Sequence, residues 1–197
     1  MVTEALKLLS EMMSKGIQPD LVTYNILIQG LCNFGRWREA TALLNEMTQR
    51  KITKRWCPPD SDLVKVNFDG AMFNEQDEAG IGVIIHNPRG KVMAALSEKI
   101  QKPPSAEILE LLAAKRAMRF SLETSFNKSV LEGDSELVIK SLRHGGYENS
   151  LGGHLIKDIL FIINSFKSIS FSHVVRQSNA FAHALAQKAR HSFPLLV

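Results

Sequence analysis

VKVNFDGA, at residues 64–71, alternates apolar and polar side chains, which is the pattern of a β-strand with two different faces. Val66 and Phe68 fall on the apolar face, whereas Asp69 falls on the polar face. Gly70 follows directly and permits a turn or the close approach of another segment. The stretch therefore predicts a strand that carries a carboxylate near a tightly packed point.

Residues 106–122, AEILELLAAKRAMRFSL, predict a helix at about 100° per residue. The charges of Lys115, Arg116 and Arg119 gather on one side of this helix, and Glu110 falls near the middle of the apolar arc. An isolated buried charge costs several kcal/mol or more, so this carboxylate must be protonated, paired or bound to a cation.

A third acid, Asp134, ends the short apolar strand SVLEGD and precedes the helical stretch SELVIKSL. The carboxyl end of a strand is a common place for a ligand site, although Asp134 alone is equally explained as a cap of the helix. Asp69 alone is explained as a solvated strand residue. A cluster of carboxylates is nevertheless the usual way to hold Mg²⁺, so the three acids together suggest a metal site.

Five segments in order resemble the plant ribonuclease H-like family related to the RNase H domains of reverse transcriptases. They are VNFDGA, AGIGVII with the turn HNPRG, ELLAAKRAM, LEGDS and VVRQSNAFAHALAQKA, and they span roughly residues 56–191. The resemblance implies an α/β fold, a five-stranded mixed sheet flanked by helices. The expected strands are 63–72, 79–87 and 90–100 as an antiparallel meander, then 128–133 and 168–176 in parallel. Asn87-Pro88-Arg89-Gly90 independently predicts a hairpin turn.

The chemistry that this resemblance implies is hydrolysis of RNA paired to DNA by two divalent cations, Mg²⁺ or Mn²⁺. Asp69, Glu110 and Asp134 match the metal ligands of the family. The fourth acid of its N-x-x-x-D motif is His183 here, in the segment Asn179-Ala-Phe-Ala-His183. Histidine alone is explained as a structural or surface residue; it is a poor ligand for Mg²⁺, but it moves protons near neutral pH, so we count His183 as a candidate catalytic residue.

Candidate contacts to nucleic acid in this part of the chain are Arg176 and Asn179, with Lys65 as a further local cation. Glu107 and Glu136 stand where the family has polar residues that read the substrate, and their charge opposes a phosphate backbone. We therefore expect weak, salt-sensitive binding and slow or altered cleavage.

The first 55 residues contain an internal repeat, because EALKLLSEMMSKGI at residues 4–17 matches EATALLNEMTQRKI at residues 39–52 with an offset of 35. The stretch GIQPDLVTYNILIQGLCNFGRWREATALLNEM resembles pentatricopeptide repeats, which read single-stranded RNA. Asn25 matches a base-contacting position, and Arg55 stands where its usual partner is an amide or acid. One and a half repeats do not specify an RNA sequence, so a packed hairpin or a fused gene fragment also explains this segment.

The net charge of +4 divides unevenly between the two expected domains. Residues 1–55, the helical repeats, hold 8 Lys/Arg against 5 Asp/Glu, and residues 56–197, the RNase H-like domain, hold 16 against 15. Two cysteines without zinc-ligand spacing fit a reducing, intracellular compartment. We find neither a long apolar run nor a signal or transit peptide, and expect a monomer without a membrane span.

Three functions remain open at this point. The first is a metal-dependent endonuclease that cleaves the RNA strand of RNA–DNA hybrids. The second is a nucleic-acid-binding module that keeps the fold without turnover. The third is a helical-repeat adaptor whose first 55 residues bind RNA or a protein. The convergence of the three acids favours the first.

Overall fold

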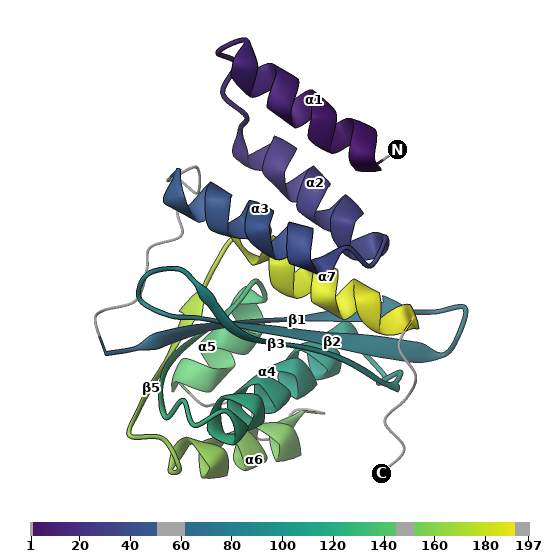
Figure 1. Ribbon diagram of the computed structural model, residues 1–197. Helices are drawn as coiled ribbons and strands as arrows, with labels where there is room; N and C mark the ends of the chain where they lie inside the picture. Colours follow the sequence, from purple (N-terminus) through teal and green to yellow (C-terminus); the bar gives the residue numbers. More distant parts are fainter. Residues whose placement is uncertain (1, 51–61, 145–151, 192–197) are drawn as a thin grey trace. The chain divides into compact units, whose positions relative to one another are not determined.

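The computed structural model describes residues 2–50, 62–144 and 152–191 (Figure 1). The chain divides into two compact units, Met1–Cys57 and Pro58–Val197. The domain boundary predicted between residues 55 and 56 lies outside the described residues, as do Arg55 and Cys57.

In the first unit, the described residues 2–50 form the helices α1 (Val2–Ser14), α2 (Leu21–Asn33) and α3 (Trp37–Gln49). The carboxylate of Asp20 caps α2 by accepting a hydrogen bond from the backbone N–H of Thr23 at 2.8 Å. Leu9 and Leu44, which are identical residues at the offset of 35, are both buried. Leu8 is 59% exposed whereas its counterpart Leu43 is buried, so the repeat in the sequence is only in part a repeat of packing.

The second unit contains a five-stranded sheet in the order β3-β2-β1-β4-β5. Its first three strands, β1 (Val64–Phe73), β2 (Glu78–His86) and β3 (Val92–Gln101), form an antiparallel meander. Strand β4 (Lys128–Gly133) pairs in parallel with β1, and β5 (Ser168–His173) pairs in parallel with β4. The predicted mixed sheet is confirmed.

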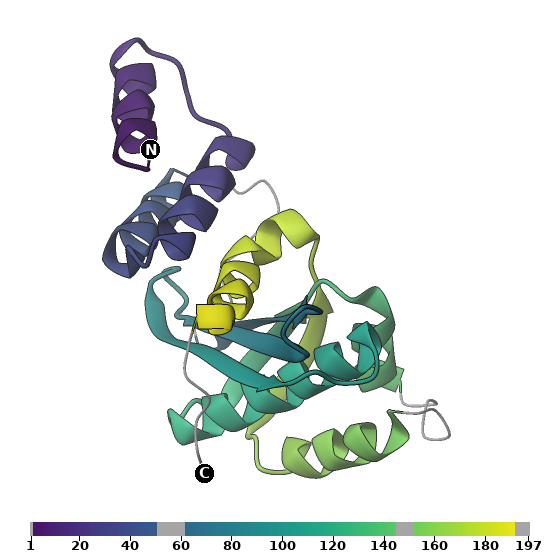
Figure 2. The same cartoon turned by 90° about the vertical axis from the view of Figure 1, so that its right-hand side faces the viewer.

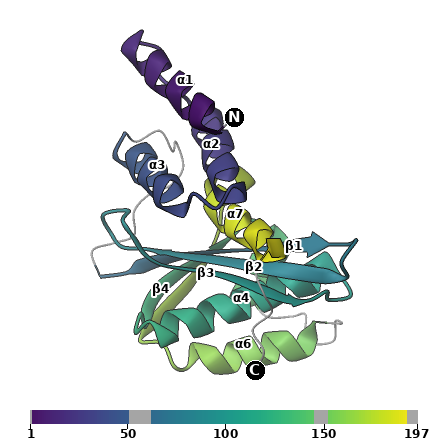
Figure 3. The same cartoon turned by 45° about the vertical axis from the view of Figure 1, so that its right-hand side comes forward.

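Helices cover both faces of this sheet (Figures 1 and 2). Helices α4 (Ala106–Glu123) and α5 (Glu136–His144) pack on one face, and α6 (Gly153–Ile163) packs on α4 further from the sheet, as Figure 3 shows. Helix α7 (Ala180–Lys188) lies on the opposite face, against β1 and β2. The apolar face of β1, including Val66 and Phe68, is buried in the core with Leu111 and Met118 of α4.

Helix α7 rests directly on the backbone of β2 because two glycines leave room for it. An ideal Cβ on Gly80 would lie 2.1 Å from the carbonyl oxygen of Ala186, and one on Gly82 would lie 2.1 Å from that of Ala182. The hydroxyl of Ser97 donates to the carbonyl oxygen of Leu185 at 2.8 Å and ties the helix to β3 as well. These contacts fix the helix that carries His183.

The first four strands begin and end within two residues of the ranges that the resemblance implies. The predicted hairpin turn is confirmed: the N–H of Gly90 donates to the carbonyl of Asn87 at 2.8 Å, and Gly90 has a φ of 75°. The last strand is shorter than the predicted 168–176, because residues Arg176–Asn179 form a short 3₁₀ turn that leads into α7. Within the described residues, none of the helices combines the length and the apolar character needed to span a membrane.

Candidate functional site

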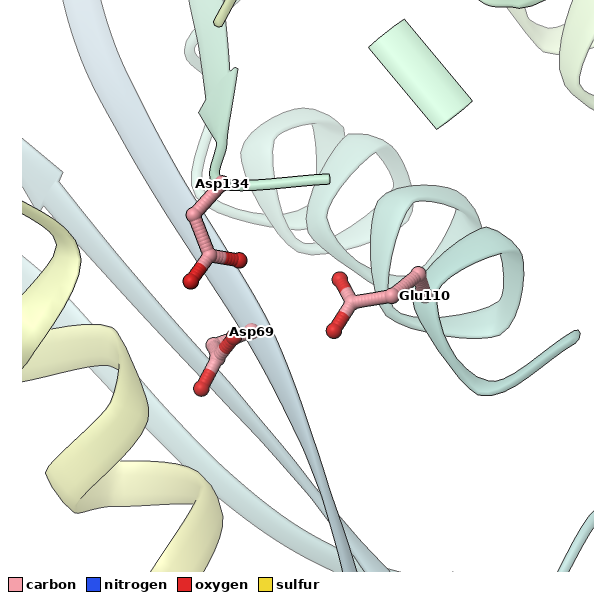
Figure 4. A group of neighbouring side chains, drawn as sticks. All are labelled: Asp69, Glu110 and Asp134. Atoms are coloured by element: carbon pink, nitrogen blue, oxygen red, sulfur yellow. The ribbon is translucent and has the colours of Figure 1, made fainter. Parts of the chain in front are cut away.

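The three predicted acids meet at one place in the second unit. Asp69 lies in β1, Glu110 in α4, and Asp134 directly after the last residue of β4. One carboxylate oxygen from each lies within 4.8 Å of the others, and Figure 4 shows the side chains directed toward a common space. Asp69 is buried, and the other two are half-buried. Residues far apart in the chain thus form a site with the ligand chemistry that a hard divalent cation prefers.

The close approach of α4 to β1 brings Glu110 to Asp69. An ideal Cβ on Gly70 would lie 2.5 Å from Cγ of Leu109, so only glycine leaves room for the leucine that precedes Glu110. The backbone N–H of Gly70 also hydrogen-bonds to the Glu110 carboxylate. The glycine that follows Asp69 in the sequence is therefore what allows the strand and the helix to share a site.

The place of Asp134 is fixed by the residues on either side of it. Gly133 packs against the ring of Phe68, where a Cβ would lie 2.6 Å from Cζ. Ser135 accepts the hydrogen bond from the N–H of Val138 at 3.4 Å at the start of α5, so the helix takes its side-chain cap from Ser135. The alternative that Asp134 serves as the cap is therefore wrong, and its carboxylate faces the other acids.

The burial of these carboxylates makes their ionised forms unfavourable in free energy. Burial, with the charges of Asp69 and Asp134 adding to it, raises the pKa of Glu110 to about 9. Burial also raises the pKa of Asp69, and the hydrogen bond from His183 opposes that rise. Among the described residues, the buried Oε2 of Glu110 has no hydrogen-bond partner. A bound cation would offset the repulsion and satisfy this oxygen, so the three residues fit a divalent metal ion.

His183, the residue in place of the fourth acid, contacts the cluster directly. Its Nδ1 lies 2.6 Å from Oδ2 of Asp69, close enough for the ring N–H to donate to the carboxylate. Arg176 lies beside it, with Nη2 at 3.4 Å from Nδ1 of His183 and Nη1 at 3.7 Å from Oδ2 of Asp134. The Arg176 side chain is 70% exposed, so it is still available to a substrate.

Two predicted nucleic-acid contacts are wrong for a physical reason. Asn179 is buried, and its Nδ2 donates to the carbonyl oxygen of Phe68 at 2.8 Å. Lys65 is also buried, with its Nζ 2.7 Å from Oε1 of Glu132. Asn179 therefore connects α7 to β1, and Lys65 is paired with Glu132 inside the unit. Neither side chain is exposed for a contact with nucleic acid. Asn25 is half-buried in α2 of the other unit, and its contact with RNA remains a prediction.

Sequence reasoning missed a polar row beneath the acids. Glu132 is buried in β4 and accepts a hydrogen bond from Nδ2 of Asn67 at 3.2 Å in addition to the ion pair with Lys65. The available signal was a glutamate inside the apolar strand SVLEGD, which is as unusual as the glutamate in α4.

Solved structures with the same fold share about two thirds of this chain. The RNase H1 of the halophilic archaeon Halobacterium salinarum is 26% identical, covers 66% of this chain and 98% of its own, and superposes with a TM-score of 0.60. The N-terminal RNase H domain of a Mycobacterium tuberculosis protein is 19% identical, with coverages of 66% and 95% and a TM-score of 0.56. LC11-RNase H1 from compost, solved in complex with an RNA/DNA hybrid, is 23% identical, with coverages of 64% and 95% and a TM-score of 0.56.

Family models divide the chain in the same way as its packing does. The PPR repeat model matches residues 1–17 and 15–48. No curated protein matches the chain. Residues 67–189, which include all three acids and His183, match the model named reverse transcriptase-like. That match covers more than half of the sequence, and the chain belongs to the reverse transcriptase-like family, with an RNase H fold.

Proposed function

We propose that this chain is a metal-dependent endonuclease that hydrolyses the RNA strand of RNA–DNA hybrids. The observation that carries the proposal is the meeting of Asp69, Glu110 and Asp134 within 4.8 Å, with a buried glutamate oxygen that lacks a partner among the described residues. The RNase H fold supports it, as does the RNA/DNA hybrid bound by LC11-RNase H1.

The three carboxylates would hold Mg²⁺ or Mn²⁺, which lowers the pKa of a bound water and neutralises charge on the phosphate. In the reaction, a water molecule would lose a proton as its oxygen bonds to phosphorus, a phosphorus–oxygen bond of the RNA backbone would break, and the leaving oxygen would take up a proton. Arg176 would bind a phosphate oxygen beside the acids. Asp69 orients His183 through the hydrogen bond at Nδ1.

Charges near the site make slow turnover the expected result. Glu107 and Glu136 are exposed, and Glu136 forms an ion pair with Lys140 at 2.8 Å. Residues 56–197 carry nearly equal numbers of basic and acidic groups, so long-range attraction to a phosphate backbone is small.

The test is cleavage of a labelled RNA–DNA hybrid by the purified chain in Mg²⁺ and in Mn²⁺. We expect cleavage of the RNA strand in the wild type and its loss in Asp69→Asn. Asp77→Asn is the matched control, because Asp77 is 80% exposed in the turn between β1 and β2, and its φ of 53° suits asparagine. Cleavage that survives Asp69→Asn would refute the assignment of the site.

The second candidate is a module that binds hybrids without cleaving them. His183 favours it, because an imidazole replaces an acid of the family motif and occupies an oxygen of Asp69. Binding of the hybrid by the wild type without cleavage in either metal would select this function. The third candidate, an RNA or protein adaptor, rests on the PPR matches at residues 1–17 and 15–48, and deletion of residues 1–55 without loss of binding would remove it.

A further inference from the structure

We propose that the site takes a single divalent cation and that the Arg176 guanidinium supplies the positive charge that a second cation would bring. This inference rests on the proposed function and concerns the number of ions, for which the family resemblance implies two.

The first cation position is complete. Asp69, Glu110 and Asp134 together offer three oxygens within 4.8 Å of one another. Oε2 of Glu110 is buried without a hydrogen-bond partner among the described residues, so it is available as a ligand. Three hard oxygen donors, together with water and a substrate oxygen, suffice for one Mg²⁺ or Mn²⁺.

A second position next to Asp69 does not fit the residues present. It would have to use the oxygen of Asp69 on the side of α7, and Oδ2 is already 2.6 Å from Nδ1 of His183. Within the described residues, the acidic cluster has three carboxylates, and the first position would use one oxygen of each. The side chain that α7 contributes is an imidazole, which hard cations bind poorly. Two cations would therefore have to share three acids.

Arg176 occupies this region with a permanent charge. Its guanidinium contacts both Asp134 and His183: Nη1 lies 3.7 Å from Oδ2 of Asp134, and Nη2 lies 3.4 Å from Nδ1 of His183. The contacts are long and the side chain is 70% exposed, so the five N–H donors of the fork are not all taken up by the protein. Arginine binds phosphate through two parallel hydrogen bonds, and a phosphate placed here would lie between a cation on one side and a guanidinium on the other.

The start of α7 is anchored to β1 beside the acids. Asn179 follows Arg176 by three residues and is anchored by its hydrogen bond to the carbonyl of Phe68, the residue before Asp69. This hydrogen bond ties the backbone of the short turn Arg176–Asn179 to β1, so the Arg176 side chain starts from a point next to the acids.

The experiment counts ions directly. We would titrate the full chain with Mn²⁺, measuring the heat of binding and the electron paramagnetic resonance signal of free Mn²⁺. The wild type is expected to bind one Mn²⁺, and His183→Asp, which restores a carboxylate, is expected to bind two. Arg176→Ala should still bind one Mn²⁺, while its affinity for a hybrid in Ca²⁺ falls about tenfold, as for loss of one charge-assisted contact. Arg119→Ala removes an exposed arginine from the outer side of α4 and is the control.

The possible outcomes separate the two proposals. Two Mn²⁺ bound to the wild type would overturn the inference, as would a hybrid affinity unchanged in Arg176→Ala. A single Mn²⁺ in His183→Asp, with an unchanged melting temperature, would overturn the role of His183 in limiting the count. One Mn²⁺ in the wild type without cleavage of the hybrid supports the count and contradicts the nuclease function. No Mn²⁺ bound at all contradicts both.

Discussion

Replacing Glu110 by glutamine should stabilise the metal-free chain, although it removes a residue of the site. The pKa of Glu110 rises from 4.5 to about 9 on folding, first because of burial and then because of Asp69 and Asp134. Between these pH values the folded chain binds a proton that the unfolded chain has released, so the free energy of unfolding falls as the pH rises. Glutamine is neutral and similar in shape, and it does not carry this cost.

The size of the effect follows from the pKa values of Glu110. From pH 4.5 to pH 8 the cost grows over about 3.5 pH units, which corresponds to about 5 kcal/mol at 1.36 kcal/mol per unit. Water entry and sharing of the proton with Asp69 reduce this, and we expect about 2 kcal/mol in favour of Glu110→Gln at pH 8. For a unit of this size the gain raises the melting temperature by roughly 8 °C. At pH 5 the difference should shrink to less than about 1 kcal/mol, because the cost has then built up over only about half a pH unit above the unfolded pKa of 4.5.

Urea denaturation and thermal melting at pH 5 and pH 8, with and without Mn²⁺, provide the assay. Mn²⁺ should stabilise the wild type in proportion to the logarithm of its concentration and should leave Glu110→Gln almost unchanged. Glu107→Gln is the matched control, since Glu107 is exposed in the first turn of the same helix. The reasoning is refuted if Glu110→Gln is no more stable than the wild type at pH 8 without metal, or if its advantage is the same at pH 5.

Two further substitutions test how α7 is held. Gly82→Ala places a Cβ 2.1 Å from the carbonyl oxygen of Ala182, so α7 must shift, and we expect a loss of about 3 kcal/mol in urea denaturation together with weaker Mn²⁺ binding. Gly30→Ala is its control, because no atom lies within 4 Å of that Cβ and alanine favours the helix by up to about 1 kcal/mol. Asn179→Ala leaves the carbonyl of Phe68 without its donor and should cost about 1–3 kcal/mol in urea denaturation. A free energy of unfolding equal to that of the wild type would mean that this hydrogen bond does not hold α7 on β1.

The parts of the fold that the sequence predicts are those with local signals. The alternation in residues 64–69 predicts β1, and the turn at Asn87 predicts the hairpin between β2 and β3, because each depends on neighbours in the chain. The glutamate on the apolar arc of α4 predicts a buried carboxylate for the same reason, and the structure places Glu110 beside Asp69 and Asp134. The proposal that they bind metal still needs the experiments above.

What the sequence could not predict depends on contacts between distant residues. The alternation of β1 places Lys65 on the polar face of the strand. The sequence does not show whether that polar face is exposed to water or buried, and in the structure Lys65 is buried. The role of Asn179 depends on a hydrogen bond to Phe68, 111 residues away. His183 and Asp69 are 114 residues apart, and the packing of α7 on β1 and β2 brings them together.

The row beneath the acids explains how like charges stay together in the metal-free chain. Asn67 pairs with Glu132 in the parallel register of β1 and β4, and each residue comes two positions before an acid of the site, Asp69 or Asp134. Side chains two positions apart share one face of a strand, about 6.6 Å along it. The hydrogen bond from Asn67 and the ion pair from Lys65 therefore hold Glu132 directly below the cluster.

A buried ion pair of this kind contributes little net stability, because desolvation offsets most of the attraction. Its effect is on the register in which β4 pairs with β1. If β4 slipped by one residue along β1, Glu132 would turn to the opposite face and both contacts to its carboxylate would be lost. The same slip would carry Asp134 away from Asp69. Asp69 and Asp134 repel one another without a cation, and the Lys65–Glu132–Asn67 row supplies contacts outside the cluster that help to set their spacing.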